Sequence, residues 1–173
     1  MKSVRWVLAA VVAGLLVLSG CSNPGANVAA TVNGVDIPGS QIESAVQAIG
    51  TSPGQLAEPH AIVLTFAIRG EVARTIAAEQ GIQLTGEPRT TVLNSNPSLA
   101  QYAEVPNAAD FVTDVIDSNL VTNRIGEAAF VAKIADADVQ VNPRYGSWSV
   151  QSAAVDQAGG QLSKSWASPT PAP

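Results

Sequence analysis

The feature that most constrains this fold is a short hairpin signal with no neighbouring strand nearby in the sequence. Residues 28–32 favour an extended strand, and residues 35–37 can return antiparallel to them. Between them lies Asn33-Gly34, a dipeptide that accepts the two positive φ angles of a type I′ turn. Two short strands are not stable alone. The one late strand candidate is the segment 138–148, so we expect the two ends of the domain to pair.

Helical spacing dominates the region between these strands. A first helix is expected over 41–49, where Ser40 and Glu43 have the spacing of a capping box. A second is expected over 59–80, which begins with proline and is followed by glycine. A short helix is expected over 97–103. The sequence therefore predicts a mainly α protein with a small antiparallel β element, in which the N-terminal hairpin and the C-terminal strand close around a helical domain.

The most apolar helix is expected over 107–131. Asn107 is placed to cap its first turn, and apolar residues cover much of its circumference, so it should lie centrally. Gly126 lies inside this segment, where glycine costs about 1 kcal/mol relative to alanine. We therefore expect another backbone to approach closely at that position.

The first twenty residues have the layout of an export signal. Lys2 and Arg5 precede an apolar stretch that is shorter than the roughly 20 residues a spanning helix needs. Residues 18–21, Leu-Ser-Gly-Cys, resemble a lipobox, in which small residues precede a cysteine that takes diacylglycerol. A buried or reactive lone thiol is the alternative for Cys21. We expect residues 1–20 to be removed and a lipid on Cys21 to hold the protein in the cell envelope, at the outer face of the cytoplasmic membrane.

The mature chain divides into a spacer, a domain and a tail. Residues 21–27 are the lipidated cysteine and a flexible linker, residues 28–148 form one domain, and residues 149–173 are expected to be a flexible tail. Removal of residues 1–20 leaves seven basic residues against fourteen acidic ones. This acidic balance argues against nucleic acid as a partner and leaves the lipid as the attachment to the membrane.

The chain is poor in the residues that catalysis and metal binding use. It has one histidine and one cysteine, fewer than the common zinc sites require. His60 is interpreted as a partly exposed residue at a helix start rather than a catalytic base. Asp110, Asp114 and Asp117 share one side of a helix, and we interpret them as a solvated acidic face because no loop supplies carbonyl ligands for calcium. We expect no enzyme activity, no metal and no cofactor.

Aromatic residues of the helices and of the late strand are candidates for contact with polypeptides. In helices, such residues are more often plain core, and the two alternatives stay open at this stage. Two residues of the late strand can equally serve to cover the core. The candidate polypeptide-binding residues are Phe66, Phe111, Phe130, Tyr145 and Trp148.

The order of these segments resembles the N-terminal domain of SurA-type and PrsA-type extracytoplasmic chaperones and foldases. The resemblance rests on the hairpin 28–37 followed by the helix at Ser40, on the helix exit 77–85 and on the closing segment 138–148. It covers most of residues 28–148. In that family, the helical domain contacts unfolded polypeptide and a separate parvulin domain isomerises X-Pro bonds. The helices here fill the space between the matching ends, so the resemblance implies the chaperone domain without the parvulin domain.

Three functions follow from these expectations. The first is a membrane-anchored holdase that binds unfolded or exported polypeptides in an apolar groove, without a covalent step. The second is an envelope scaffold that binds one folded partner. The third and least favoured is a peptidyl-prolyl isomerase, because His60 is the only histidine.

Overall fold

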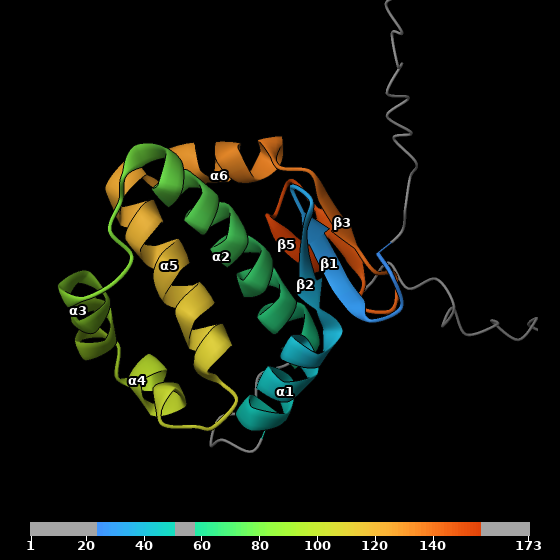
Figure 1. Cartoon of the computed structure of the whole chain (residues 1–173), viewed down its shortest axis with the longest axis horizontal. Helices are drawn as coiled ribbons and strands as arrows, with labels where there is room; N and C mark the ends of the chain where they lie inside the picture. Colours follow the sequence, from blue (N-terminus) through green and yellow to red (C-terminus); the bar gives the residue numbers. More distant parts are fainter. Residues whose placement is uncertain (1–23, 51–57, 157–173) are drawn as a thin grey trace, which may run out of the picture.

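The computed structural model describes residues 24–50 and 58–156. Within these ranges the fold is mainly helical with two small antiparallel sheets, which confirms the prediction of a mainly α protein with a small antiparallel β element (Figure 1). The predicted export signal, Cys21 and residues 157–173 lie outside the described residues. No helix in the described part is long and apolar enough to cross a membrane.

The first sheet joins the two ends of the described chain. Strands β1 (Val28–Val32) and β2 (Val35–Pro38) form the predicted hairpin, and both turn residues have positive φ, 50° at Asn33 and 83° at Gly34. Strand β3 (Val139–Val141) pairs antiparallel with the other edge of β1, giving the order β2-β1-β3. The predicted pairing of early and late strands is therefore confirmed for these residues.

The chain continues beyond β3 as a second hairpin. Strand β4 (Ser147–Ser149) pairs with β5 (Ala154–Asp156), not with the first sheet. The backbone N–H of Val155 donates to Thr65 Oγ1 at 2.9 Å, and the Val155 side chain is buried. The prediction that the flexible tail begins at residue 149 is therefore wrong as far as Asp156, because a buried valine and a paired strand hold this segment on the helical domain.

The first two helices pack beside the sheet. Helix α1 (Gly39–Gly50) contains Ser40 inside its first turn, so the predicted capping box is wrong. The Glu43 carboxylate instead accepts hydrogen bonds from side chains of other segments. Helix α2 (Pro59–Gln80) has the predicted bounds and ends at Gly81, whose φ of 66° is left-handed.

The predicted helix over 107–131 is two helices in the structure. Helix α5 (Ala109–Ile125) is followed by α6 (Glu127–Asp136), and Gly126 between them has φ 89° and ψ 149°. Apart from Gly126 and its two chain neighbours, no described residue has an atom within 4 Å of where a Gly126 Cβ would be, so the expected close approach is also wrong. Asn107 has a positive φ of 68° and does not cap α5. The apolar pattern continues across the break because both helices face the same core.

Two short helices connect α2 to α5 along one side of the domain (Figure 1). Helix α3 (Glu87–Ser95) buries none of its residues. Helix α4 (Pro97–Ala103) has the predicted bounds, and it starts at Asn96, whose side chain accepts a hydrogen bond from the Leu99 N–H. Leu99 is buried and holds α4 on the domain.

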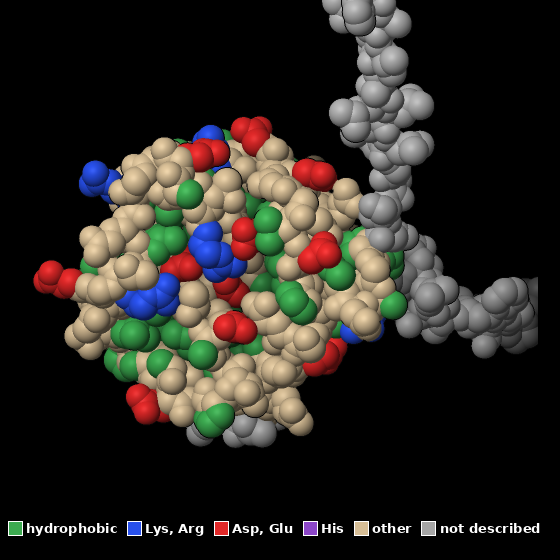
Figure 2. Space-filling model, in the orientation of Figure 1, with side chains coloured by type: hydrophobic (Ala, Val, Ile, Leu, Met, Phe, Trp, Pro, Cys, Tyr) green, Lys and Arg blue, Asp and Glu red, His purple; other side chains and the backbone are tan. Residues whose placement is uncertain are grey.

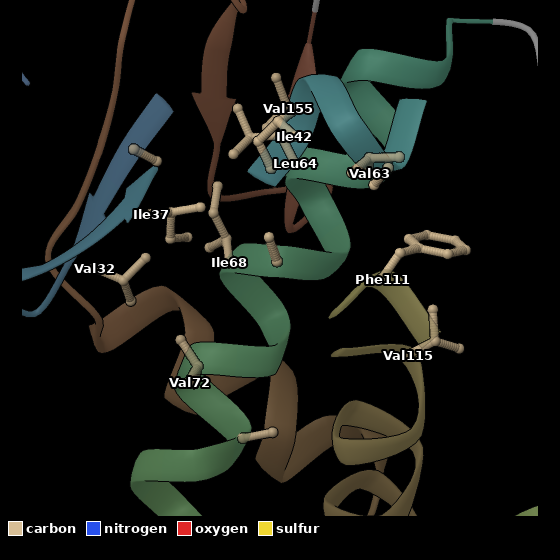
Figure 3. Packing of buried hydrophobic residues seen from close by; sticks show 14 of the residues in the cluster. Val32, Ile37, Ile42, Val63, Leu64, Ile68, Val72, Phe111, Val115 and Val155 are labelled. Carbon is tan, nitrogen blue, oxygen red and sulfur yellow. The ribbon is translucent and has the colours of Figure 1, made fainter. Parts of the chain in front are cut away.

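Helix α2 runs through the centre of the core. It packs along α5 on one side and against α1, β1 and β5 on the other (Figure 1). Figure 3 shows side chains of the hairpin, α1 and β5 converging on α2, with those of α5 on the other side. The labelled residues of this cluster are Val32, Ile37, Ile42, Val63, Leu64, Ile68, Val72, Phe111, Val115 and Val155.

Candidate functional site

The five aromatic residues predicted to contact polypeptides do not share one surface. Phe130 is fully buried, and Phe111 and Tyr145 are buried as well. Phe66 is half-buried and its ring meets Phe111 edge-on, with 5.8 Å between centroids. Trp148 is half-buried. The groove prediction is therefore wrong for the three buried residues, which belong to the core.

His60 takes part in a small polar joint between α1, the start of α2 and the loop after β3. Its Nε2 lies 3.1 Å from Glu43 Oε2, and the Tyr145 hydroxyl donates to Glu43 Oε1 at 3.1 Å. The Arg144 guanidinium stacks on the Tyr145 ring. The His60 hydrogen bond lowers the pKa of Glu43 against the opposing effect of burial. Because each group faces a neighbouring side chain, the geometry fits a structural joint better than a free general base.

A second group of charges joins α2, α3 and α5. Arg74 Nη1 lies 2.8 Å from Asp114 Oδ1 and 3.3 Å from Asp117 Oδ2, while its Nη2 lies 2.9 Å from Glu71 Oε2. Arg89 Nη2 donates to Asp117 Oδ1. Asp114 and Asp117 are only 3% and 2% exposed. We call these five residues, Glu71, Arg74, Arg89, Asp114 and Asp117, the ionic cluster.

The sequence interpretation of these aspartates as a solvated face is wrong for Asp114 and Asp117. The interpretation is correct for Asp110, which is exposed. Burial of Asp114 depends on Gly70, because a Cβ at Gly70 would lie 2.5 Å from Asp114 Oδ1 and 2.9 Å from its Cα. The missing side chain lets α5 approach α2 and places the carboxylate under Arg74. A glycine within an otherwise strongly helical segment is the sequence signal that points to this contact.

The ionic cluster has more acids than bases. It contains three carboxylates and two guanidinium groups, so one carboxylate lacks a full counter-charge. Burial raises the pKa of Asp114 to about 7, although the Arg74 hydrogen bond and charge act to lower it. Burial also raises the pKa of Asp117, against the effect of Arg89 and Arg74. We infer that Asp114 is the carboxylate that binds a proton near neutral pH.

The pKa of Asp114 gives the domain a testable pH dependence. The folded protein holds a proton between pH 4 and 7 that the unfolded chain releases, so the stability from this group is lost as the pH rises towards 7. Asp114→Asn keeps the size and the acceptor oxygen but does not titrate. Between pH 5 and 8 we expect the wild type to lose about 2 to 3 kcal/mol that the variant retains. Urea unfolding at both pH values measures this, and equal losses in the two proteins would contradict the assignment.

Arg89 makes the polar contacts that join helix α3 to α5. Besides its contact with Asp117, the Arg89 side chain donates from Nε to the Leu84 carbonyl at 3.1 Å and from Nη1 to Thr113 Oγ1 at 3.3 Å. The apolar residues Val92 and Leu93 of the same helix are only half-buried. Arg89 alone therefore donates hydrogen bonds to three residues outside α3.

A pocket lies between the end of α2, the start of α3 and α5, and we call it the α3 pocket. Its volume is about 350 Å³, at the small end of the range for ligand sites. Figure 2 shows basic and acidic side chains across the centre of this face, with apolar side chains beside them near α3 and α4. The lining of the α3 pocket includes the apolar Ile82, Pro88 and Leu120 and the polar Gln83, Asn123 and Arg124.

Neither metal chemistry nor a known relative assigns a function to these features. Among residues 24–50 and 58–156, no group of three or more His, Cys, Asp or Glu side chains is arranged to hold a metal ion. No protein-family model, curated protein or solved structure matches this chain. The surface of the domain is therefore the remaining basis for a proposed function.

Proposed function

We propose that this protein is a lipid-anchored, extracytoplasmic binding protein that holds segments of unfolded or exported polypeptides at the α3 pocket, without catalysis. The single observation that carries the proposal is the concentration of half-buried apolar side chains around α3. Ile82, Leu84, Val92, Leu93 and Leu120 lie on α3, on the segment before it and on α5. The export-signal pattern, the lipobox at Cys21 and the resemblance to SurA-type chaperones support the same proposal.

The chemistry of the α3 pocket suits a polypeptide segment. Its apolar lining can contact one or two apolar side chains of a bound peptide, and burial of each of these side chains contributes about 1.5 to 3 kcal/mol. Gln83 and Asn123 carry amide groups that can pair with a peptide backbone, and Arg124 can donate hydrogen bonds to a carboxylate. Apolar contact with polar groups at the edge is the usual composition of a surface that binds peptides reversibly.

A second candidate function is a scaffold that binds one folded envelope partner. The observation that favours it is the small number of well-exposed large apolar side chains: in the described part of the chain these are Val35 and Val150. A binder of many clients benefits from a larger apolar patch than a specific interface needs. Crosslinking in cells separates the two, because many unrelated exported proteins favour the holdase and one dominant partner favours the scaffold.

The holdase proposal is tested with the soluble form that lacks residues 1–21. This form contains no cysteine, so dithiothreitol can be used to reduce insulin and start aggregation of its B chain without affecting the protein itself. We expect the wild type to slow aggregation at stoichiometric ratios. Leu120→Glu places a charge in the α3 pocket and should weaken this effect about tenfold, as loss of one buried apolar side chain predicts.

Asn119→Glu is the matched control. It adds the same charge to the neighbouring, exposed position of α5 and should leave suppression of aggregation unchanged. The glutamate at position 120 lies four residues before Arg124, a spacing that favours the helix, so the variant should fold. Wild-type protein without effect on aggregation would contradict the holdase proposal.

The lipid anchor is tested separately in the full chain. Cys21→Ala should move the protein from the membrane fraction to the soluble fraction or leave it unprocessed.

A further inference from the structure

Helix α3 differs from the other helices in how it is held. Among the described helices it is the one that buries none of its residues, and Gly86 and Asn96 lie at its two ends. Gly86 before it has φ 74° and ψ −139°, a conformation that only glycine adopts readily. Asn96 after it has φ −130° and ψ 88°, and the following helix α4 is fixed by the buried Leu99. A movement of α3 about these two positions would leave α4 held by the buried Leu99 and by its cap at Asn96.

Helix α3 closes onto α5 through the apolar residues Val92 and Leu93 and through the polar contacts of Arg89. Arg89 carries the ion pair to Asp117, the bond to Thr113 and the bond to the Leu84 carbonyl. The Arg89 side chain is 25% exposed, whereas the Asp117 side chain is 3% exposed. The acceptor therefore belongs to the rigid core, and the donor belongs to the surface helix. For α3 to move away from α5, the Arg89 side chain must first break its contact with Asp117. We call this contact the latch.

We propose that α3 is a strap that opens about Gly86 and Asn96 when Arg89 leaves Asp117, and that its opening enlarges the α3 pocket into a wider apolar surface for client polypeptides. This inference rests on the function proposed above and adds how access to the site is controlled. Opening adds the core-facing sides of Val92 and Leu93 to the apolar surface that Leu120 already offers in the α3 pocket. Helices α2 and α5 stay in place because they pack on one another through the core.

Release of α3 also leaves the rest of the ionic cluster paired. Arg74 keeps its contacts with Asp114, Asp117 and Glu71, all of which lie on α2 or α5. Asp117 therefore retains one guanidinium partner when Arg89 departs. The strap can open without leaving a buried carboxylate isolated, and this is the reason to place the latch at Arg89 and not at Arg74.

Amide hydrogen exchange of the full chain tests the strap independently of client binding. In the wild type, the amides of α3 should exchange faster than those of α2 and α5. Arg89→Gln removes the charge-assisted bond and should speed exchange in α3 about tenfold or more, while α2 and α5 stay protected. Arg89→Lys keeps the charge near Asp117 but loses the forked donors, so it should fold in any case and give an intermediate increase.

Lys133→Gln is the matched control for the loss of one positive charge. Lys133 lies on α6 and pairs with Glu79 at 3.8 Å, with both side chains largely exposed. This variant should leave exchange in α3 unchanged. Exchange of α3 together with α5 as one unit, in the wild type and in both Arg89 variants, would overturn the strap.

Client binding is then measured on the same variants with fluorescently labelled, reduced and alkylated lactalbumin as the unfolded probe. If α3 is a strap over the binding surface, Arg89→Gln should bind this probe several-fold more tightly than the wild type, and Lys133→Gln should not. Faster exchange in α3 without tighter binding would retain the movement but overturn its role in client access. Wild-type protein that neither binds the probe nor slows aggregation contradicts the proposed function itself, whatever the exchange result.

Discussion

Asp117→Ala is expected to lower the free energy of unfolding by about 3 to 5 kcal/mol at neutral pH, the range for removal of one partner from a buried ion pair. Asp117 accepts hydrogen bonds from Arg74 and Arg89 and is nearly inaccessible to solvent. Its removal leaves the Arg89 guanidinium with no carboxylate partner, only the Leu84 carbonyl and the Thr113 hydroxyl, and takes one of the three carboxylates from Arg74. Urea unfolding followed by circular dichroism measures the loss.

Asp117→Asn is the matched variant for this experiment. It keeps the volume and one acceptor oxygen, so it separates the effect of charge from that of the cavity and the lost hydrogen bonds. We expect a loss of stability well below that of the alanine variant. A change under about 1 kcal/mol for Asp117→Ala, the value typical of an exposed ion pair, would show that the cluster is solvated in solution.

Phe130→Ala is the second variant with a large expected effect. The Phe130 side chain is fully buried, and the Arg69 guanidinium lies 5.5 Å from the centre of its ring. Removal of a buried phenylalanine costs about 3 to 5 kcal/mol because both the transfer free energy and the packing are lost. Thermal unfolding of the soluble form provides the measurement.

The half-buried Val131 on the same helix supplies the control. Val131→Ala should destabilise the domain by less than about 1.5 kcal/mol, since fewer contacts are removed. The pair also decides between the two alternatives that the sequence left open for Phe130. A client-binding residue would lose affinity at unchanged stability, whereas a core residue loses stability, and the second result is expected here.

Local signals in the sequence predicted much of the fold. The turn at Asn33-Gly34 and the helix ends at Pro59 and Gly81 were correct because a single backbone conformation explains each residue. The break at Gly126 was missed because hydrophobic spacing does not register an extended residue between two helices that face one core. Hydrophobic periodicity indicates which face of a helix is buried. It does not indicate where one helix ends and the next begins in another direction.

The candidate site was less accessible to sequence reasoning. Asp114 and Asp117 resemble a solvated acidic face in isolation, because their burial depends on Arg74, which is 40 residues from Asp114 in the sequence. Gly70 is the one local sign of this contact, and only the structure gives it meaning. The contacts of α3 were equally hidden. A helix that buries none of its residues has no periodic pattern of buried positions from which its contacts could be predicted.

The central position of β1 sets the order in which the domain can fold. Its partner β3 lies at the far end of the helical region, and the bond between the Asn33 side chain and the Asp138 N–H spans 105 residues of sequence. Contacts of such long range form slowly because the intervening loop must close first. A chain that emerges N-terminus first therefore carries an unpaired β1 edge until nearly all of its helices have appeared. Residues 139–141 can complete the sheet only after helix α6 has been made, and the β4–β5 hairpin follows them in the chain.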